Sequence, residues 1–575
     1  MKPNSYLFLY TIGPVQSFIA RARKTRDLWS GSALLSELSL KTVLYAQQKF
    51  KAQPIFPRID GGKKFMPNRF LVMIETDKIE EVGKQLEQYT RKLLEQRAND
   101  VLKHVKKMPP SFDEQIKKFL QIYWVAIPCE NGEYPEKFSE IERLLAAVKN
   151  VRAFEPLREP QGRKCSLSGE RIALFYNERN KPSGIVPEAV PVGGFRLTPG
   201  EALDAIGFLK RCYQPANADK SLSFPSTAEI ALSEFLARFP KPQLLSDYKK
   251  LFEGEGYSFD AQLFFEENLT EQYFRKYGIE VDPEKAKELL EKIKKEAQKE
   301  NLIFQKYYAI VMLDGDNVGA WLSGSKFNSK SKFSRDNLLE YHTHVSKQLG
   351  LYAQEVEKLF SAHKGKGALI YCGGDDVLAF VNLAHLAPIL KNLREKLPDL
   401  DGTGRYTATA GVVIAHYKIP LSEVLKWVRK IEKEAKDRDQ NKDKLAIAVL
   451  KHSGEIEKCV IPWYLLDNTP VLDILQKLHN AWRGELLSTN FVRQLFNSFH
   501  RLLDTEGDFM HKNLLSVEME RLVKRSVLNK GKTGEGKEYI DALVKQLNQF
   551  LVENPKLKDF MSFLGIADFM ERKVK

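Results

Sequence analysis

The sequence predicts a multidomain α+β protein, and three observations support this fold class. The 575 residues suffice for roughly three to five domains, and 43% of them are apolar, which is enough for several packed cores. Short β-type runs alternate with helical patterns in two separate regions of the chain. Loops and helices dominate the remainder. We therefore expect four units, at 1–150, 151–300, 301–455 and 456–575.

Charge and cysteine content narrow the class of protein. Lys and Arg (89) outnumber Asp and Glu (75), which gives a net charge of +14. This surplus suits a polyanionic partner such as nucleic acid, although a merely soluble basic protein shows it too. The five cysteines form no close pair, which is typical of a reducing compartment. Because we find no signal-peptide pattern and no apolar run as long as a membrane span, we expect a cytoplasmic protein without a membrane partner.

In the first unit, short apolar runs separated by helical patterns predict an α+β domain. Gly13-Pro14 ends the first run, and the long helical pattern that follows is expected to break near Ser30-Gly31-Ser32. The segment 54–67 is turn-rich. We expect strands at 5–12, 69–74 and 121–127, and helices at about 15–50 and 78–105.

The regions 151–300 and 456–575 are predicted to be loop-rich and helical, respectively. Gly and Pro are frequent at 155–200, so loops dominate there. Asp282 can cap a helix that starts at Pro283, and the Lys/Glu alternation that follows is typical of a solvated connector. We expect helices at 201–212, 227–238 and 283–299, and mainly helices after residue 460.

The second unit begins with the element order βαββαβ, which is the ferredoxin-like arrangement and also the core of palm domains that transfer nucleotides. Its first strand ends in Asp314-Gly315-Asp316, and its central pair of strands surrounds Gly373-Gly374-Asp375-Asp376. We expect strands at 307–313, 368–370, 377–381, 406–415 and 445–450, and helices at about 336–360, 385–396 and 421–437.

The Gly-Gly-Asp-Asp stretch predicts a hairpin with two acids at its tip. Glycines let the backbone turn tightly and let a bulky ligand approach closely. Adjacent carboxylates are costly unless a cation lies beside them, and a divalent metal is the usual one. Because Gly and Asp are also common turn residues, a solvated turn explains the motif equally well when it is taken alone.

The ferredoxin-like order makes the first strand and the hairpin neighbours in the sheet. It places Asp314 and Asp316 beside Asp375 and Asp376. Three or four carboxylates around one point predict two Mg²⁺ or Mn²⁺ ions, with water and substrate phosphates completing their coordination. Two such ions would activate an attacking hydroxyl and stabilise a leaving pyrophosphate in an in-line displacement.

Lysines near this cluster suit phosphate chemistry. Lys436, late in the predicted helix 421–437, could reach a triphosphate as a point charge, although a solvated helix face explains it equally well. Lys326, Lys330 and Lys332 could touch phosphate or RNA, and a solvated loop is the simpler interpretation. We expect Cys372 to be a small buried side chain rather than a nucleophile.

The two α+β units also show a weak internal similarity. Each passes from a buried strand through a small polar turn into a longer segment. The first unit has Thr11 and Gly13 where the second has Asp314 and Asp316. Duplication of one unit with acids only in the second copy explains this pattern, and so does chance.

Longer motifs in both units add a family resemblance. They are Gly13-Pro14-Val15-Gln16-Ser17-Phe18-Ile19, Ala22-Arg23-Lys24-Thr25-Arg26-Asp27-Leu28-Trp29-Ser30-Gly31-Ser32, Leu34-Leu35-Ser36, Met66-Pro67-Asn68-Arg69-Phe70, Asp314-Gly315-Asp316, Gly373-Gly374-Asp375-Asp376, Ala410-Gly411-Val412-Val413-Ile414-Ala415-His416 and Glu434-Ala435-Lys436. With these motifs the sequence resembles the large polymerase-like subunit of type III CRISPR effector complexes, most closely the III-B (Cmr) branch.

This resemblance implies two ferredoxin-like palm domains, at 1–150 and 301–455, of which only the second is active. It implies a degenerate zinc-ribbon-like linker and a helical C-terminal domain. The implied activity is synthesis of cyclic oligoadenylates from ATP when the complex binds target RNA. By analogy, Asp314, Asp375 and Asp376 hold metal and perform catalysis. The residues implied to bind the nucleotide are Gly315, Asp316, Gly373, Gly374 and Lys436.

The resemblance also implies partners and leaves one alternative open. The partners are the guide RNA and target RNA, the backbone subunits, the subunit that binds the 5′ end of the guide, and the small helical subunit. The alternative is an RNA-binding scaffold with a catalytically silent palm.

Two departures from the family pattern are visible. Family members often begin with a His-Asp nuclease domain, but none of the ten histidines here is followed by Asp, so we expect no DNase activity of that type. Family members often carry paired Cys-x-x-Cys zinc ligands, whereas here Ser168 stands where the partner of Cys165 would be. Since structural zinc needs four Cys or His ligands, we do not expect bound zinc.

Overall fold

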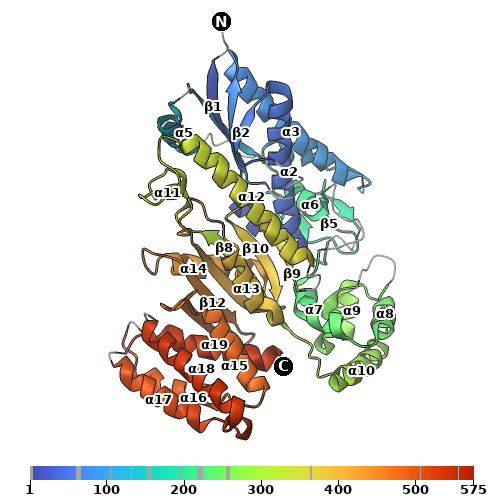
Figure 1. Ribbon diagram of the computed structural model, residues 1–575. Coiled ribbons are helices and arrows are strands. Elements are labelled where there is room, and N and C mark those ends of the chain that lie inside the picture. Colours follow the sequence, from blue (N-terminus) through green and yellow to red (C-terminus); the bar gives the residue numbers. More distant parts are fainter. Residues whose placement is uncertain are drawn as a thin grey trace.

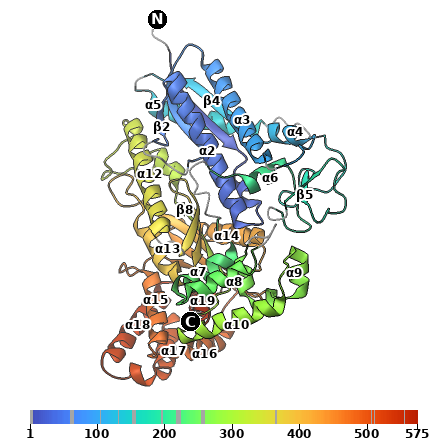
Figure 2. The ribbon, with the colours of Figure 1, turned by 90° about the vertical axis from the view of Figure 1, so that its right-hand side faces the viewer.

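A computed structural model describes the whole chain except residues 1–3, 60–65, 104, 131, 152–157, 194–196, 216–223, 254–258, 363–365, 506, 510, 555 and 575. Two sheet domains lie one above the other, with the first (blue) on top in Figure 1. The C-terminal helices (red) pack below the second sheet, and a group of middle helices (green) lies at its side (Figures 1 and 2). In the described residues, no helix is both long enough and apolar enough to cross a bilayer.

The first sheet has four antiparallel strands in the order β2-β3-β1-β4. Helices α2 and α3 pack on one face, where apolar side chains from β1 and β3 meet them, and α5 packs on the other. This is the ferredoxin-like arrangement, as predicted for the first unit. The elements are β1 (Ser5–Gly13), α1 (Gln16–Ala20), α2 (Thr25–Phe50), β2 (Gln53–Phe56), β3 (Arg69–Glu75), α3 (Ile79–Leu102), α4 (Phe112–Lys117), β4 (Gln121–Pro128) and α5 (Tyr134–Asn150).

Two local predictions for this unit were wrong. The segment 54–67, expected to be turn-rich, overlaps the strand β2, which forms the edge of the sheet by pairing with β3. The break in the long helix comes before α2, not near Ser30-Gly31-Ser32, because the Asp27 carboxylate accepts hydrogen bonds from the backbone N–H groups of Arg23 and Lys24 and so fixes the start of α2. Gly31 lies inside α2, where a Cβ would come 2.6 Å from Cε of Lys210.

The second sheet has six strands in the order β13-β12-β11-β8-β10-β9. Its β11-β8-β10-β9 part repeats the strand order of the first sheet, β4-β1-β3-β2. Helices α12 and α13 cover one face, α14 covers the other, and β13 continues the sheet past residue 455. The elements are β8 (Tyr307–Gly315), α11 (Val318–Leu322), α12 (Leu338–Ala362), β9 (Gly367–Cys372), β10 (Val377–Asn382), α13 (Leu386–Glu395), β11 (Ala408–His416), α14 (Leu421–Lys436), β12 (Lys444–Leu450) and β13 (Ile456–Pro462).

The middle region contains a small sheet and a group of helices. The order of this sheet is β6-β5-β7, and its residues share a core with the first unit. Helix α7 packs against β10 of the second sheet, so the region joins the two units. The elements are β5 (Phe175–Asn177), β6 (Val190–Val192), β7 (Ala202–Leu203), α6 (Ala205–Cys212), α7 (Thr227–Arg238), α8 (Pro242–Lys250), α9 (Glu271–Tyr277) and α10 (Pro283–Lys299).

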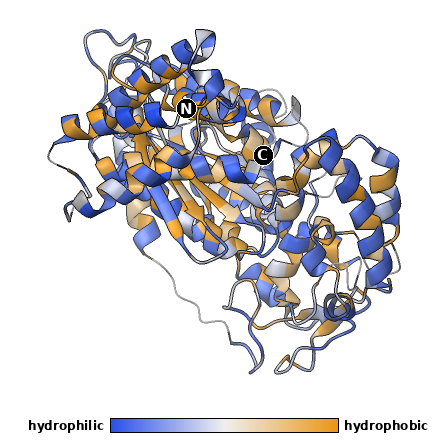
Figure 3. Cartoon of the chain, turned by 90° about the horizontal axis from the view of Figure 1, so that it is seen from below, coloured by the Kyte–Doolittle hydropathy of each residue, from blue (hydrophilic) through white to orange (hydrophobic). Residues whose placement is uncertain are grey.

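The C-terminal helices share one apolar core with the second sheet. Figure 3 shows the apolar residues concentrated on the strands and on the helix faces turned toward them. Helix α12 extends from the second unit to the first, where it contacts α5 and β2. The C-terminal elements are α15 (Val471–Arg483), α16 (Asn490–Phe499), α17 (Lys512–Arg525), α18 (Gly534–Glu553) and α19 (Leu557–Val574).

Candidate metal and nucleotide site

Three carboxylates meet at one edge of the second sheet. Asp314 lies near the end of β8, and Asp375 and Asp376 lie in the turn between β9 and β10. Because β8 and β10 are antiparallel, with Leu313 opposite Val377, the end of β8 comes beside this turn. Each residue offers an oxygen, and these oxygens all lie within 4.8 Å of one another. The structure therefore brings together the three acids that the sequence analysis proposed as metal ligands.

The two glycines shape the turn that presents these acids. The N–H of Gly373 donates to the carbonyl of Asp376 over 3.0 Å, which closes the turn. Gly374 has a φ of +121°, a conformation that side-chain-bearing residues rarely adopt. A Cβ at Gly374 would also come 3.3 Å from the Cβ of Leu349 on α12. The glycines therefore serve the backbone geometry that places Asp375 and Asp376 at the tip.

Asp316 does not join this cluster, contrary to the arrangement predicted for four acids. Its side chain is buried, and its carboxylate accepts hydrogen bonds from the hydroxyls of Thr407 and Thr409, each over 2.9 Å. The backbone N–H of Asp443 donates a third, over 3.0 Å. Burial nevertheless raises the pKa of Asp316. This carboxylate ties β11 and the loop after α14 to the end of β8.

A fourth acid near the site is Glu432 on α14, which the sequence analysis missed. Lys436, one turn later, forms ion pairs with both Asp314 and Glu432, the latter over 2.7 Å. A Cβ at Gly411 would lie 2.8 Å from the Cβ of Glu432, so this glycine lets α14 approach β11 closely. The spacing of four residues between Glu432 and Lys436 was the available signal.

Only part of the Glu434-Ala435-Lys436 motif faces the site. The carboxylate of Glu434 pairs with Lys458 on β13, over 2.6 Å, and Ala435 is buried in the core. Lys436 alone reaches the acids. It lies beside Asp314, and its contact with a phosphate stays a prediction.

The electrostatics of the cluster favour a cation. Asp376 remains open to solvent, while protein atoms crowd around its carboxylate. The partial loss of hydration caused by these protein atoms, followed by the charges of Asp375 and Glu432, raises the pKa of Asp376 to about 8. Burial also raises the pKa of Asp375. Negative charge in this cluster is therefore unfavourable without a positive partner, and hard carboxylate oxygens suit Mg²⁺ or Mn²⁺.

The other predicted residues occupy expected surroundings. Lys326, Lys330 and Lys332 are exposed in the loop that follows α11. The Ser331 hydroxyl fastens this loop by donating to the carboxylate of Asp401 over 2.6 Å. Cys372 is completely buried in the core, as predicted.

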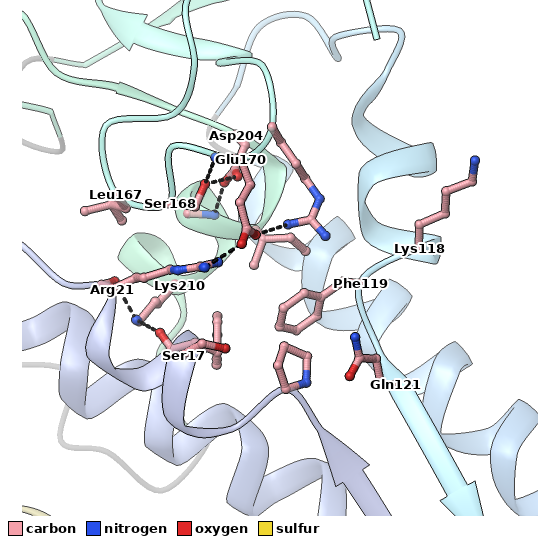
Figure 4. A pocket seen from close by; sticks show the side chains of 15 residues that line it. Ser17, Arg21, Lys118, Phe119, Gln121, Leu167, Ser168, Glu170, Asp204 and Lys210 are labelled. Carbon is pink, nitrogen blue, oxygen red and sulfur yellow. Dashed lines mark hydrogen bonds and ion pairs between the residues drawn. The ribbon is translucent and has the colours of Figure 1, made fainter. Parts of the chain in front are cut away.

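A cavity of about 330 Å³ lies apart from the acids, between the first unit and α6 (Figure 4). The ammonium of Lys210 donates to the carbonyls of Phe18, Ile19 and Arg21, and the Arg21 side chain pairs with Glu170. The carboxylate of Asp204 accepts from the N–H of Gly207 and from the hydroxyl of Ser168. These polar groups hold the first unit and the middle region together.

Comparison with known proteins agrees with this architecture. The model of the Cas10/Cmr2 second palm domain matches residues 307–446, and that of the N-terminal region of CRISPR-associated protein Cmr2 matches residues 7–107. The Cmr subunit Cmr2 of the CRISPR system of Pyrococcus furiosus is 25% identical, over 96% of this chain and 73% of that protein.

Solved structures show the same fold. A chain of the type III-B Cmr-beta assembly in its apo state matches with a TM-score of 0.63 and 15% identity, over 96% of this chain and 82% of that one. A chain of the same assembly bound to cognate target RNA matches with a TM-score of 0.66 and 14% identity, over 99% and 83%. Both palm regions thus match Cas10/Cmr2 sequence models, and the chain has the fold of the matched chain of the type III-B Cmr-beta assembly along nearly its whole length.

Proposed function

We propose that the chain is the polymerase-like subunit of a type III-B CRISPR effector complex, and that its second palm makes cyclic oligoadenylates from ATP when target RNA binds. The main support is the convergence of Asp314, Asp375 and Asp376, whose oxygens lie within 4.8 Å of one another at the edge of a palm sheet. The relative from Pyrococcus furiosus is a Cmr subunit, and one structural match is bound to cognate target RNA. The partners proposed are therefore the guide RNA, the target RNA and the other Cmr subunits.

The donor set fits two Mg²⁺ or Mn²⁺ ions. Three carboxylates supply hard oxygen ligands and leave coordination positions for water and substrate phosphates. Bound ions would activate the attacking hydroxyl and stabilise the leaving pyrophosphate. Asp314 approaches from the strand and the Asp375–Asp376 pair from the hairpin, so ligands come from two sides.

The surrounding residues would bind and orient the triphosphate. Lys436 neutralises Asp314 in the absence of ions, and its flexible ammonium is a suitable point charge for a phosphate. Gly373 and Gly374 let the hairpin turn tightly, with Tyr371 and Leu349 packed where their Cβ atoms would be, and so present the acid pair to the nucleotide. Glu432 holds the lysine in place from the preceding turn of α14.

The experiment is to incubate the assembled complex with ATP, Mn²⁺ or Mg²⁺ and target RNA, and to analyse the products by mass spectrometry. We expect cyclic oligoadenylates from the wild type and none from the Asp375→Ala, Asp376→Ala variant, which should still assemble. Asp541→Ala, which removes an exposed carboxylate from α18, is the matched control. If the wild type makes no oligonucleotide with either metal, the chain is instead an RNA-binding scaffold with a silent palm. If the product is a linear oligomer or a dinucleotide, the proposed cyclic product is wrong and the proposed nucleotidyl transfer stands.

A further inference from the structure

Tyr406, in the segment just before β11, has a buried hydroxyl without a hydrogen-bond partner among the described residues. Its side chain is 4% exposed. A buried hydroxyl that makes no hydrogen bond destabilises the folded state, so native structures rarely leave a hydroxyl in this condition. When such a hydroxyl lies beside a functional site, its partner can be a ligand that is absent or a nearby side chain in another orientation.

The hydroxyl lies directly beside the acid cluster. A Cβ built on Gly315 would overlap the Tyr406 hydroxyl oxygen and would lie 3.0 Å from the Cβ of Asp375. The phenol tip and the Asp375 side chain therefore flank the same small volume. Gly315, which the family resemblance assigns to the nucleotide, is the residue that makes room for this phenol.

The ring of Tyr406 is held firmly in place. Trp321 of α11, itself buried, meets it edge to face, with ring centroids 6.2 Å apart and planes at 86°. Leu349 of α12 and Leu400 belong to the same apolar cluster. The ring therefore cannot leave the site easily, whereas the neighbouring Asp375 carboxylate can change its orientation by rotating about its own side-chain bonds.

We propose that Tyr406 is a positioning residue whose hydroxyl donates a hydrogen bond to the carboxylate of Asp375 when the site is loaded with divalent metal. A phenol is a hydrogen-bond donor at neutral pH, and an ionised carboxylate accepts up to four such bonds. The hydrogen bond would occupy one oxygen of Asp375 and direct the other toward the ion. Outer partners of this kind orient metal ligands and typically contribute about 10–100-fold in affinity.

This inference rests on the proposed metal site, and Mn²⁺ binding to the full chain tests it without requiring synthesis. We expect Tyr406→Phe to bind Mn²⁺ about 10–100-fold more weakly than the wild type, measured by calorimetry or electron paramagnetic resonance. Its melting temperature should be unchanged or raised, because the substitution removes only a hydroxyl that lacks a partner. The aromatic contact with Trp321 is retained.

The matched control is Tyr308→Phe. Tyr308 lies on β8 of the same sheet, is fully buried and also has a hydroxyl without a partner in the described part of the chain. The Tyr308→Phe variant should bind Mn²⁺ with the same affinity as the wild type. Equal affinity in Tyr406→Phe and wild type would overturn the assignment, as would a wild type that binds no Mn²⁺. A wild type that binds Mn²⁺ but makes no oligoadenylate would refute the proposed synthesis and leave the comparison of affinities decisive for Tyr406.

Discussion

The two palms have the same strand order but different residues at the same edge. Tyr10 pairs with Phe70 in the first sheet, and Leu313 pairs with Val377 in the second. Both pairs face the two helices of their own domain. The residues that come after the pair in β1 and β8, and before it along β3 and β10, therefore correspond. They are Thr11 with Asn68-Arg69 in the first palm, and Asp314 with Asp375-Asp376 in the second.

In the first palm the polar side chains at this edge find hydrogen-bond and ion-pair partners within the same domain. The amide of Asn68 donates to the hydroxyl of Thr11 over 3.3 Å and to the carbonyl of Ile12 over 3.0 Å. Arg69 forms an ion pair with Glu142 of α5. In the second palm three carboxylates gather at the same place, and the Lys436 ammonium pairs with one of them, Asp314. The comparison teaches that the shared backbone places the side chains in both palms, and that the excess negative charge in the second makes it the candidate metal site.

The largest effect expected is from removing the hairpin acids. Asp375→Asn together with Asp376→Asn should reduce oligoadenylate formation by about 1000-fold or more, equivalent to roughly 4 kcal/mol, because the ions lose two ligands. Asn68→Ala in the first palm should change the rate by less than about tenfold. The measurement is initial rate in the assembled complex. A comparable loss in both variants would break the distinction between the palms.

A smaller effect is expected at Lys436. Lys436→Ala should raise the KM for ATP and lower kcat/KM by about 10–100-fold, because a charge-assisted contact to phosphate contributes roughly 1.5–3 kcal/mol. Lys433→Ala, on the exposed side of the same helix, is the control and should change kcat/KM less than about twofold. Glu432→Gln should fall between them. Equal kinetics of the two lysine variants would exclude Lys436 from the site.

The pH dependence of stability tests the junction between the palms. His342 on α12 is buried, and its Nε2–H donates to the carbonyl of Leu322 over 2.7 Å, so Nδ1 accepts from the hydroxyl of Tyr134 on α5. Burial lowers the pKa of His342 to about 4, below its usual value near 6.5. The unfolded chain therefore binds the proton first, and stability is lost as pH falls from about 6.5 to 4, by about 3 kcal/mol from this residue.

Urea unfolding at pH 7.5 and pH 5 measures this dependence. His342→Gln should lose less stability between the two pH values than the wild type, because glutamine does not titrate. His344 lies two residues later on α12 and is more exposed. The variant His344→Gln should therefore behave as the wild type does. An unchanged pH dependence in His342→Gln would show that this histidine does not titrate with the predicted depressed pKa.

The sequence predicted more of the fold than of the finer site geometry. Alternation and periodicity located β8, the hairpin and their neighbouring helices, and strand order then brought Asp314 beside Asp375 and Asp376. The position of β2 was missed because a four-residue edge strand containing Pro54 resembles a turn. The inward turn of Asp316 was also missed, since its donors Thr407 and Thr409 are more than 90 residues away in the sequence.

Glu432 and Tyr406 were missed for the same physical reason. Neither residue lies in a motif that indicates its contacts. Glu432 reaches the acids through the packing of α14 on β11, and Tyr406 reaches them through the packing of the segment before β11 on Gly315. Gly411 and Gly315 were the visible signs of these close approaches. A sequence alone does not state which distant side chain occupies the space that a glycine leaves.

The most direct test of the account is Mn²⁺ binding by Asp314→Asn and Asp316→Asn, two variants of one short segment. Asp314 comes from a strand 61 residues before Asp375, so its effect tests the cluster and not only the hairpin. We predict that Asp314→Asn loses Mn²⁺ binding and oligoadenylate synthesis. Asp316→Asn should keep Mn²⁺ binding and lose about 1–3 kcal/mol of folding free energy, because its amide cannot replace all three accepted hydrogen bonds. Retained Mn²⁺ binding in Asp314→Asn with loss in Asp316→Asn would contradict the account.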